Sequence, residues 1–406
     1  MTVDSAKRLL AAATIFAGAF VAALALATPA SRNFAFVSGG DRLDVFTESG
    51  ALAATLGAIV AVIAAASVAR VRGAVSIAVF GCALLMFAAL VTSPVQLHLR
   101  AIAAGLILGG TAALIATNRL LQCSLVAGAV SALVMAGPIV KTPVRYRDYA
   151  ADEPQIYLLI GLAMFAVLLA VSAFVFVAPK PVESRRRVLS VGCLVPIAGL
   201  VLCWLFVRTV GSFGSHAAMQ NRWLLGLAVI PLLVGAAFAL PASTGALVLT
   251  ALAFLSAGTM SSFGLESAAA FVASLLVGIS IGWRRPMPLV GFAVLAVVAS
   301  TGAFTDPPLE VISSVANVLV LPFAVGVLYA SLLPTTAAAV TIGVTTPLAV
   351  AVPIVAEFGW TAYTPLTSVE PSFSSNTWVW TSTAVSVLSV AAAGAAYVVL
   401  TRRRGM

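Results

Sequence analysis

Long apolar runs, separated by short polar stretches, make up most of this chain. Fourteen of these runs hold enough residues to cross about 30 Å of hydrocarbon as an α-helix. They lie at 9–28, 51–69, 74–93, 99–117, 120–140, 156–178, 188–210, 223–240, 243–260, 266–283, 287–304, 309–333, 335–356 and 379–400. The division between the eighth and ninth runs is the weakest, because only Pro241–Ala242 separate them. The pattern therefore predicts twelve to fourteen transmembrane helices, with fourteen favoured.

The composition excludes a soluble protein and narrows the fold class. Apolar residues make up 62% of the 406 positions and charged residues 9%, whereas soluble domains have about 45–50% and about 25%. A transmembrane β-barrel would show short segments of alternating polarity instead. No polar segment is long enough to form a soluble domain. We therefore predict an all-α, polytopic membrane helix bundle, with residues 1–406 in a single transmembrane domain.

Charged residues sort by side of the membrane when successive helices alternate in direction. With the N-terminus in the cytoplasm, the inner side holds 14 of the 22 Lys and Arg residues, and 11 of the 13 acidic residues fall outside. This asymmetry predicts a plasma-membrane protein with both termini cytoplasmic. It also explains the net charge of +9 through topology and attraction to anionic lipids at the inner face, rather than through nucleic acid.

The first apolar run permits two interpretations. Lys7 and Arg8, the run itself and the following ALATPA resemble a secretory signal peptide with its cleavage site. The run is longer than the usual signal core, which favours an uncleaved first helix. The long polar segments all fall outside, so a ligand from water is expected to bind there; they lie at 29–50, 141–155, 211–222 and 357–378.

Proline-interrupted helices provide the first candidate binding site. Pro347 removes a helical hydrogen bond and frees the carbonyl of Gly343. Transporters bind cargo at such breaks near the midplane, so we expect this helix to depart from α geometry near Thr345–Pro347. The candidate substrate-binding residues are Asn317, Thr341, Thr345 and Thr346. The alternative is that the threonine hydroxyls bond to their own helix and the prolines only kink it.

Charged and metal-binding side chains are scarce within the apolar runs. Ion-coupled transporters commonly need a buried carboxylate, and none lies near the middle of a run. The four cysteines lack CxxC spacing, and the chain holds two histidines, His98 and His216. We therefore expect no metal and no cofactor, and we expect the cysteines to pack as small apolar side chains.

Two outer loops carry clustered charges. Asp41 and Asp44 follow the first helix, where paired carboxylates can do acid–base chemistry or hold a divalent metal. Their position is similar to that of the essential acid in membrane glycosyltransferases that use lipid-linked sugars. Arg145 and Arg147 could bind a lipid phosphate through charge-assisted hydrogen bonds. A solvated loop is the simpler interpretation of both, so Asp41 and Asp44 are catalytic candidates in a protein that we expect not to be an enzyme.

The segment before the last helix is rich in aromatic residues. Its stretch GWTAYTPL, Gly359–Leu366, resembles the outer-side loop of haem–copper oxidase subunit I, which reads GWTxYPPL and also precedes a transmembrane helix. That family ligates haem and copper through helix-borne histidines, and no histidine lies well inside a predicted helix here. The resemblance therefore implies an accessory role beside a respiratory complex, and convergence on an aromatic turn is the alternative. We predict that Trp360, Tyr363, Trp378 and Trp380 form an ordered outer cap in the headgroup layer.

Three functions fit these patterns. The favoured one is a transporter or flippase-like permease for an apolar or lipid-linked substrate, because kinked helices and short inner loops are typical of such proteins. The second is a non-catalytic subunit that binds membrane-protein partners in a larger complex. The third is an outer-leaflet, glycosyltransferase-like enzyme. A polar cavity beside Thr345 and Asn317 would favour the first, a flat apolar flank the second, and a groove reaching Asp41 the third.

Overall fold

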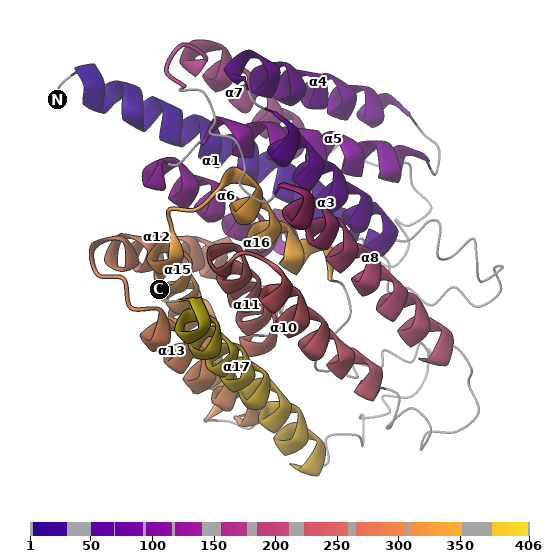
Figure 1. The fold of residues 1–406 in the computed structure, drawn as a ribbon, viewed down its shortest axis with the longest axis vertical. Helices are drawn as coiled ribbons and strands as arrows, with labels where there is room; N and C mark the ends of the chain where they lie inside the picture. The colour runs from indigo at the N-terminus through magenta and orange to yellow at the C-terminus, as the bar shows by residue number, and fades with distance from the viewer. Residues whose placement is uncertain are drawn as a thin grey trace.

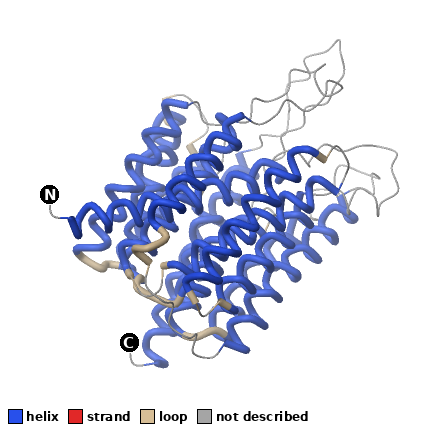
Figure 2. The backbone as a smooth tube through the Cα atoms, turned by 90° about the horizontal axis from the view of Figure 1, so that it is seen from above, coloured by secondary structure: helices blue, strands red, loops and turns tan. Residues whose placement is uncertain are grey.

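The part of the chain that the structure describes is entirely helical apart from short connections (Figure 2). The computed structural model describes residues 3–30, 50–68, 70–91, 95–115, 118–139, 156–176, 185–210, 223–258, 265–304, 308–350 and 376–404. Most residues of the predicted outer segments lie outside these ranges. The expected all-α fold class is confirmed for the described part.

Each predicted apolar run coincides with one helix in the described ranges. The first seven are α1 (Val3–Ala30), α3 (Gly50–Ser67), α4 (Val71–Leu90), α5 (Val95–Leu114), α6 (Arg119–Ile139), α7 (Ile156–Ser172) and α8 (Arg185–Val210). The second seven are η2 (Trp223–Ala228) with α10 (Val229–Ala239), α11 (Ala242–Ala257), α12 (Leu265–Arg284), α13 (Pro288–Ser300) with η3 (Thr301–Ala303), α14 (Glu310–Val315) with η4 (Ala316–Val320) and α15 (Leu321–Leu332), α16 (Ala337–Ala349) and α17 (Asn376–Arg404). Since α10 and α11 are separate, the described part of the chain holds fourteen helical stretches rather than twelve. That all fourteen cross the membrane stays a prediction, because five of them are shorter than a full span.

The helices have the length and composition of membrane spans. Of the described helices, nine are long and apolar enough to cross a bilayer, and five more are apolar but shorter. A helix bonds its backbone polar groups internally, apart from the carbonyls that a proline leaves without a donor, which is what the hydrocarbon layer requires. This is a multi-pass membrane protein.

The first and last helices extend beyond their apolar runs. The first begins at Val3 rather than at residue 9, and the last continues to Arg404 rather than ending at residue 400. Polar residues add these extra turns. The C-terminal arginines stabilise the end of α17, because cations interact favourably with the negative end of a helix dipole.

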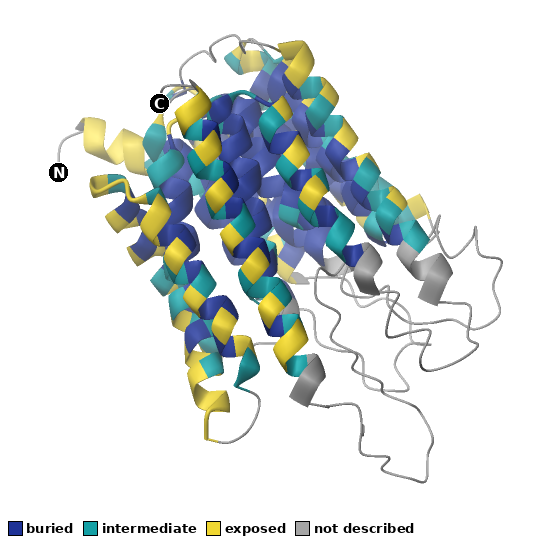
Figure 3. Ribbon diagram, turned by 60° about the horizontal axis from the view of Figure 1, so that its bottom comes forward, coloured by how far each residue is buried: buried dark blue, intermediate teal, exposed yellow. Residues whose placement is uncertain are grey.

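Many of the basic residues lie at one end of the bundle, here called the basic end. Arg185 at the start of α8 donates to the Ser67 hydroxyl at the end of α3, over 3.0 Å. Arg403 in the last turn of α17 lies over the Phe238 ring near the end of α10, at 5.5 Å. Figure 3 shows both chain termini at the same end of the bundle. These contacts agree with fourteen helices that alternate in direction.

The two halves of the chain lie side by side, with α16 between them (Figure 1). In the first half, α5 packs against α1, α3 and α4, and α7 packs on α1. In the second, α17 packs on α11 and α13, and α12 packs on α15. The helix α16 belongs to the second half by sequence, yet it contacts α3, α5, α6 and α8 as well as α11. It is therefore the main element that joins the halves.

Small residues let these helices approach closely. Alanine is the commonest residue in the buried core, which runs through both halves, and exposed apolar residues cover the outside of the bundle (Figure 3). Helices in lipid gain no hydrophobic driving force from association, so close van der Waals packing has to hold them together. The fold therefore depends on where side chains are small.

Candidate functional site

The three predicted threonines lie on α16, at the junction of the two halves. Thr341, Thr345 and Thr346 are at most 2% exposed. Their hydroxyls donate to carbonyls of the same helix: Thr341 to Ala337 at 2.9 Å, Thr345 to Thr341 at 2.8 Å and Thr346 to Ile342 at 2.7 Å. Each hydroxyl is thus satisfied locally. The helix therefore needs no hydrogen-bond partner from its apolar neighbours for these three hydroxyls.

The prediction that the helix departs from α geometry near Thr345–Pro347 was wrong. The helix α16 stays α-helical through Pro347 and ends at Ala349. Pro347 still leaves the Gly343 carbonyl without its helical donor, and the Tyr329 hydroxyl of α15 donates to that carbonyl at 2.8 Å. Tyr329 is only 1% exposed. An inter-helix hydrogen bond thus replaces the missing one, and the helix continues.

Tyr329→Phe should destabilise the protein, because it leaves the buried Gly343 carbonyl without a partner. We expect the free energy of unfolding to fall by about 1–2 kcal/mol, measured by thermal or denaturant unfolding in mild detergent. Tyr397→Phe is the matched control: Tyr397 packs on Phe292, and its hydroxyl has no partner among the described residues. An equal loss in both variants would contradict the assigned bond.

The irregular backbone that the sequence predicts lies one helix earlier, at η4. This π turn spans Ala316–Val320, and the Leu321 N–H bonds to the Ala316 carbonyl five residues back. Pro322 follows and cannot donate to the Val318 carbonyl, so the wide turn lies where the regular ladder fails. Single π turns in α-helices are frequent at functional sites.

Asn317 sits in this π turn with one amide atom unsatisfied. Its nitrogen donates to the Ser313 carbonyl at 3.0 Å. Its oxygen Oδ1 is buried and accepts no hydrogen bond within the described residues. Buried acceptors without a donor are uncommon, so this oxygen is a candidate contact for a hydroxyl or amine of a bound molecule.

Asn317 and the three threonines lie on segments that pack against different helices. The π turn η4 packs on α12, α13 and α15, whereas α16 packs on α3 and α11. No hydrogen bond of the described residues joins Asn317 to the threonines. Their shared role in binding a substrate stays a prediction.

Two polar side chains that the sequence argument missed hold the halves together at the basic end. Gln122 of α6 is fully buried. Its amide nitrogen donates to the Thr335 carbonyl at 2.6 Å, and its amide oxygen accepts from the Thr335 N–H at 2.8 Å. Thr335 lies in the short connection between α15 and α16. The lone amide inside an otherwise apolar run was the signal available in the sequence.

Arg119, at the start of α6, makes the second connection. Its Nη2 donates to the carbonyls of Ala330 at 2.8 Å and Gly282 at 3.2 Å, and its guanidinium lies 5.8 Å from the centre of the Trp283 ring. Both carbonyls are at C-terminal ends of helices, where the backbone dipole favours a cation. Arg119 and Gln122 thus fasten α6 to α12, α15 and α16.

Several predicted residues lie outside the described part of the chain. These are Asp41, Asp44, Trp360 and Tyr363, so the predicted catalytic acids, the outer cap and the oxidase-like stretch stay predictions. Trp378 falls in the first turn of α17, and the neighbouring Trp380 is 62% exposed. An exposed tryptophan at a helix end is typical of the membrane interface.

The cysteines and the remaining charges give no further site in the described residues. All four cysteines are free thiols on helices, two of them buried and two half-buried. Within the described ranges, no group of His, Cys, Asp and Glu has the arrangement of a metal site. Comparison of the sequence with protein-family models finds no match, and comparison with curated proteins finds no significant relative.

Proposed function

We propose that this multi-pass membrane protein is a permease that moves an apolar or lipid-linked cargo across the bilayer. The observation that carries the proposal is the position of α16. It is a buried helix, free of charged residues, that contacts both halves of the bundle. Transporter folds place cargo sites at the interface of two such halves, on helices with interrupted backbone bonding.

The bonding around Pro347 supports a helix that can change shape. The Gly343 carbonyl depends on one hydroxyl from another helix, Tyr329, rather than on its own backbone. Sliding of α15 against α16 would release this bond at the cost of a single inter-helix interaction, about 0.6–1.7 kcal/mol in a membrane. A regular α-helix has no comparable weak point.

The polar contacts at the basic end support a closed gate on that side. Arg119 and Gln122 connect the halves through four hydrogen bonds to backbone atoms. The charge asymmetry of the sequence supports a cytoplasmic location for the basic end. The proposal therefore has cargo enter from the opposite side, with Asn317 among the residues that meet it.

A substitution on α16 should change transport activity more than it changes the stability of the protein. We expect Thr346→Val to lower the flip rate of a fluorescent phospholipid in reconstituted liposomes by about tenfold, with a change in unfolding free energy of less than about 1 kcal/mol. Ser389→Ala is the control, since Ser389 is also buried and donates to its own helix, at the Val385 carbonyl, on the distant α17. Equal rates for protein-containing and protein-free liposomes would refute lipid transport.

A non-catalytic membrane subunit is the second candidate. It is favoured by the closed packing of α16, whose threonine hydroxyls are all satisfied by their own helix. In that case the same liposomes show no flipping, and a second protein co-purifies in fixed stoichiometry in mild detergent.

A further inference from the structure

A cavity of about 280 Å³ lies at the basic end of the described bundle. It lies where α1 begins, α5 ends, α6 begins and α7 ends. Its lining includes apolar side chains, among them Leu114, Ile115 and Phe176. The polar side chains of the lining are Asp4, Lys7, Arg8 and Asn118.

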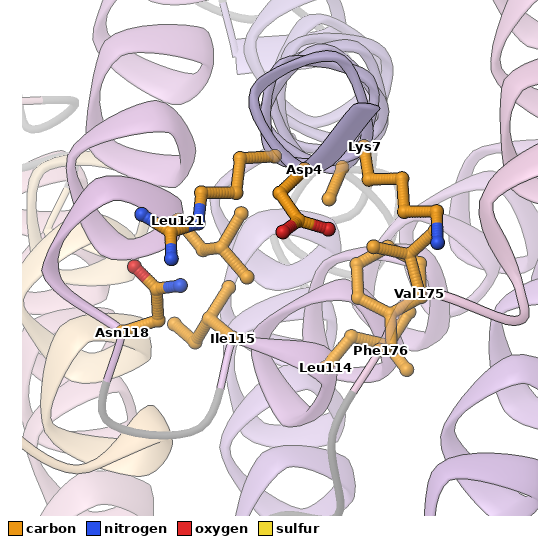
Figure 4. A pocket seen from close by; sticks show the side chains of 10 residues that line it. Asp4, Lys7, Leu114, Ile115, Asn118, Leu121, Val175 and Phe176 are labelled. Atoms are coloured by element: carbon orange, nitrogen blue, oxygen red, sulfur yellow. The ribbon is translucent and has the colours of Figure 1, made fainter. Parts of the chain in front are cut away.

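The polar side chains suit a phosphate next to a hydroxyl. Figure 4 shows Asp4 reaching from α1 into the middle of the cavity, with Lys7 on one side and Asn118 on the other. The oxygen of Asn118 accepts from the Leu120 N–H at 3.0 Å, so its amide N–H groups are left to donate. Lys7 and Arg8 supply two cations, and no ion pair among the described residues joins them to Asp4. The cations and the amide can bind phosphate oxygens, while the Asp4 carboxylate can accept from a hydroxyl.

A second, apolar hollow begins beside this cavity. It measures about 120 Å³ and lies between α4 and α7, lined by Val75, Val79, Cys82, Ala166, Leu169, Ala170 and Ala173. Ala173 is two residues from Val175, which lines the charged cavity. The end of α7 and the residues just after it therefore lie between a polar cavity at the helix ends and an apolar groove between two apolar helices. This is the division between the headgroup and the acyl chain of a lipid.

We propose that these two hollows form one binding site for an anionic glycerophospholipid whose headgroup carries hydroxyls. The phosphate lies against Lys7, Arg8 and Asn118, a headgroup hydroxyl donates to Asp4, and one acyl chain enters the groove between α4 and α7. The charged lining has two cations and one carboxylate, so a headgroup with one negative charge balances it. The site is formed by α1, α4, α5, α6 and α7 rather than by residues of α16, and it does not depend on the proposed transport.

Lipid selectivity tests the charged half of the site. Purified protein in mild detergent is titrated with phosphatidylglycerol, phosphatidylethanolamine, phosphatidylcholine and phosphatidic acid of identical chains, and bound lipid is counted by native mass spectrometry. We expect phosphatidylglycerol to bind at least about tenfold more tightly than phosphatidylcholine, through charge-assisted hydrogen bonds to the cations. The double variant Lys7→Gln/Arg8→Gln should remove this preference. The control Arg70→Gln/Arg72→Gln removes two exposed cations at the start of α4, outside the cavity, and should leave the preference intact.

Three further arms separate the alternatives. Asp4→Asn should weaken phosphatidylglycerol but not phosphatidic acid, which lacks the headgroup hydroxyls. Ala170→Phe fills the groove from an exposed position and should weaken lipid binding, whereas Val171→Phe, on the neighbouring exposed face, should not. Free glycerol phosphate should not displace the lipid.

Opposite outcomes would overturn the proposal. Equal loss in the two double variants would show attraction to surface charge without a site. Displacement by free glycerol phosphate at similar concentration would assign the cavity to a soluble phosphate compound. Equal effects of Ala170→Phe and Val171→Phe would remove the acyl chain from the groove. Elution volume and helical content of each variant are checked first, because all the substituted side chains are exposed and the fold should persist.

Discussion

Gln122→Leu should reduce the free energy of unfolding by about 3 kcal/mol. An inter-helix hydrogen bond in a membrane protein contributes about 0.6 kcal/mol on average and up to about 1.7 kcal/mol. Gln122 makes two such bonds, and both partners are backbone atoms of Thr335, a residue only 7% exposed. Neither atom has another backbone partner in the described residues, so each loss should fall near the upper value.

The measurement is unfolding in mild detergent by heat or denaturant. Ser124→Ala is the matched control on the same helix, because the Ser124 hydroxyl donates to its own helix at the Leu120 carbonyl. We expect a change below about 0.5 kcal/mol there. If Gln122→Leu proves as stable as Ser124→Ala, the connection between α15 and α16 does not depend on the Gln122 amide. It would also weaken the argument for a gate at the basic end.

The helices and their order could be predicted from the sequence because the membrane imposes one simple pattern. A run long enough to cross the bilayer must be helical. When successive helices alternate in direction, most of the basic residues fall on one side of the membrane. The structure places Arg119, Arg185 and Arg403 in contact with helix ends that the alternation assigns to their side. Helix ends were less predictable, since the first turns of α1 are polar and an apolar pattern cannot find them.

The packing could not be predicted, because it depends on pairs of helices that are distant in the sequence. The pattern around Pro347 correctly identified the freed Gly343 carbonyl. It could not indicate that the Tyr329 hydroxyl donates a hydrogen bond to that carbonyl. The same holds for Gln122, whose partner lies 213 residues away. The irregular backbone predicted near Thr345–Pro347 lies instead one helix earlier, in the turn that holds Asn317 and precedes Pro322. An apolar pattern shows where a bond is lost, and only the fold shows what replaces it.

Close glycine contacts between α12 and α15 lead to the second large effect. Gly278 and Gly282 are spaced as in the small-xxx-small motif of membrane helices. A Cβ atom at Gly278 would meet the backbone of Phe323 closer than a van der Waals contact allows, and one at Gly326 would meet the Leu275 carbonyl oxygen. Backbone atoms cannot turn away as a side chain can. The two helices would have to separate along their whole contact.

Gly278→Ala should therefore lower the free energy of unfolding by about 2–3 kcal/mol, in the upper part of the range that overpacking costs. Gly235→Ala is the control of opposite sign. Gly235 lies inside α10 and is exposed, and a Cβ there would meet nothing within 4 Å. Alanine is a better helix former than glycine, by about 0.5–1 kcal/mol, so this variant should be as stable as the parent or more so. Both are measured in one detergent by the same unfolding assay. A loss at Gly235 equal to that at Gly278 would show that glycine acts there through the backbone alone, and the close approach of α12 and α15 would not be what stabilises the second half.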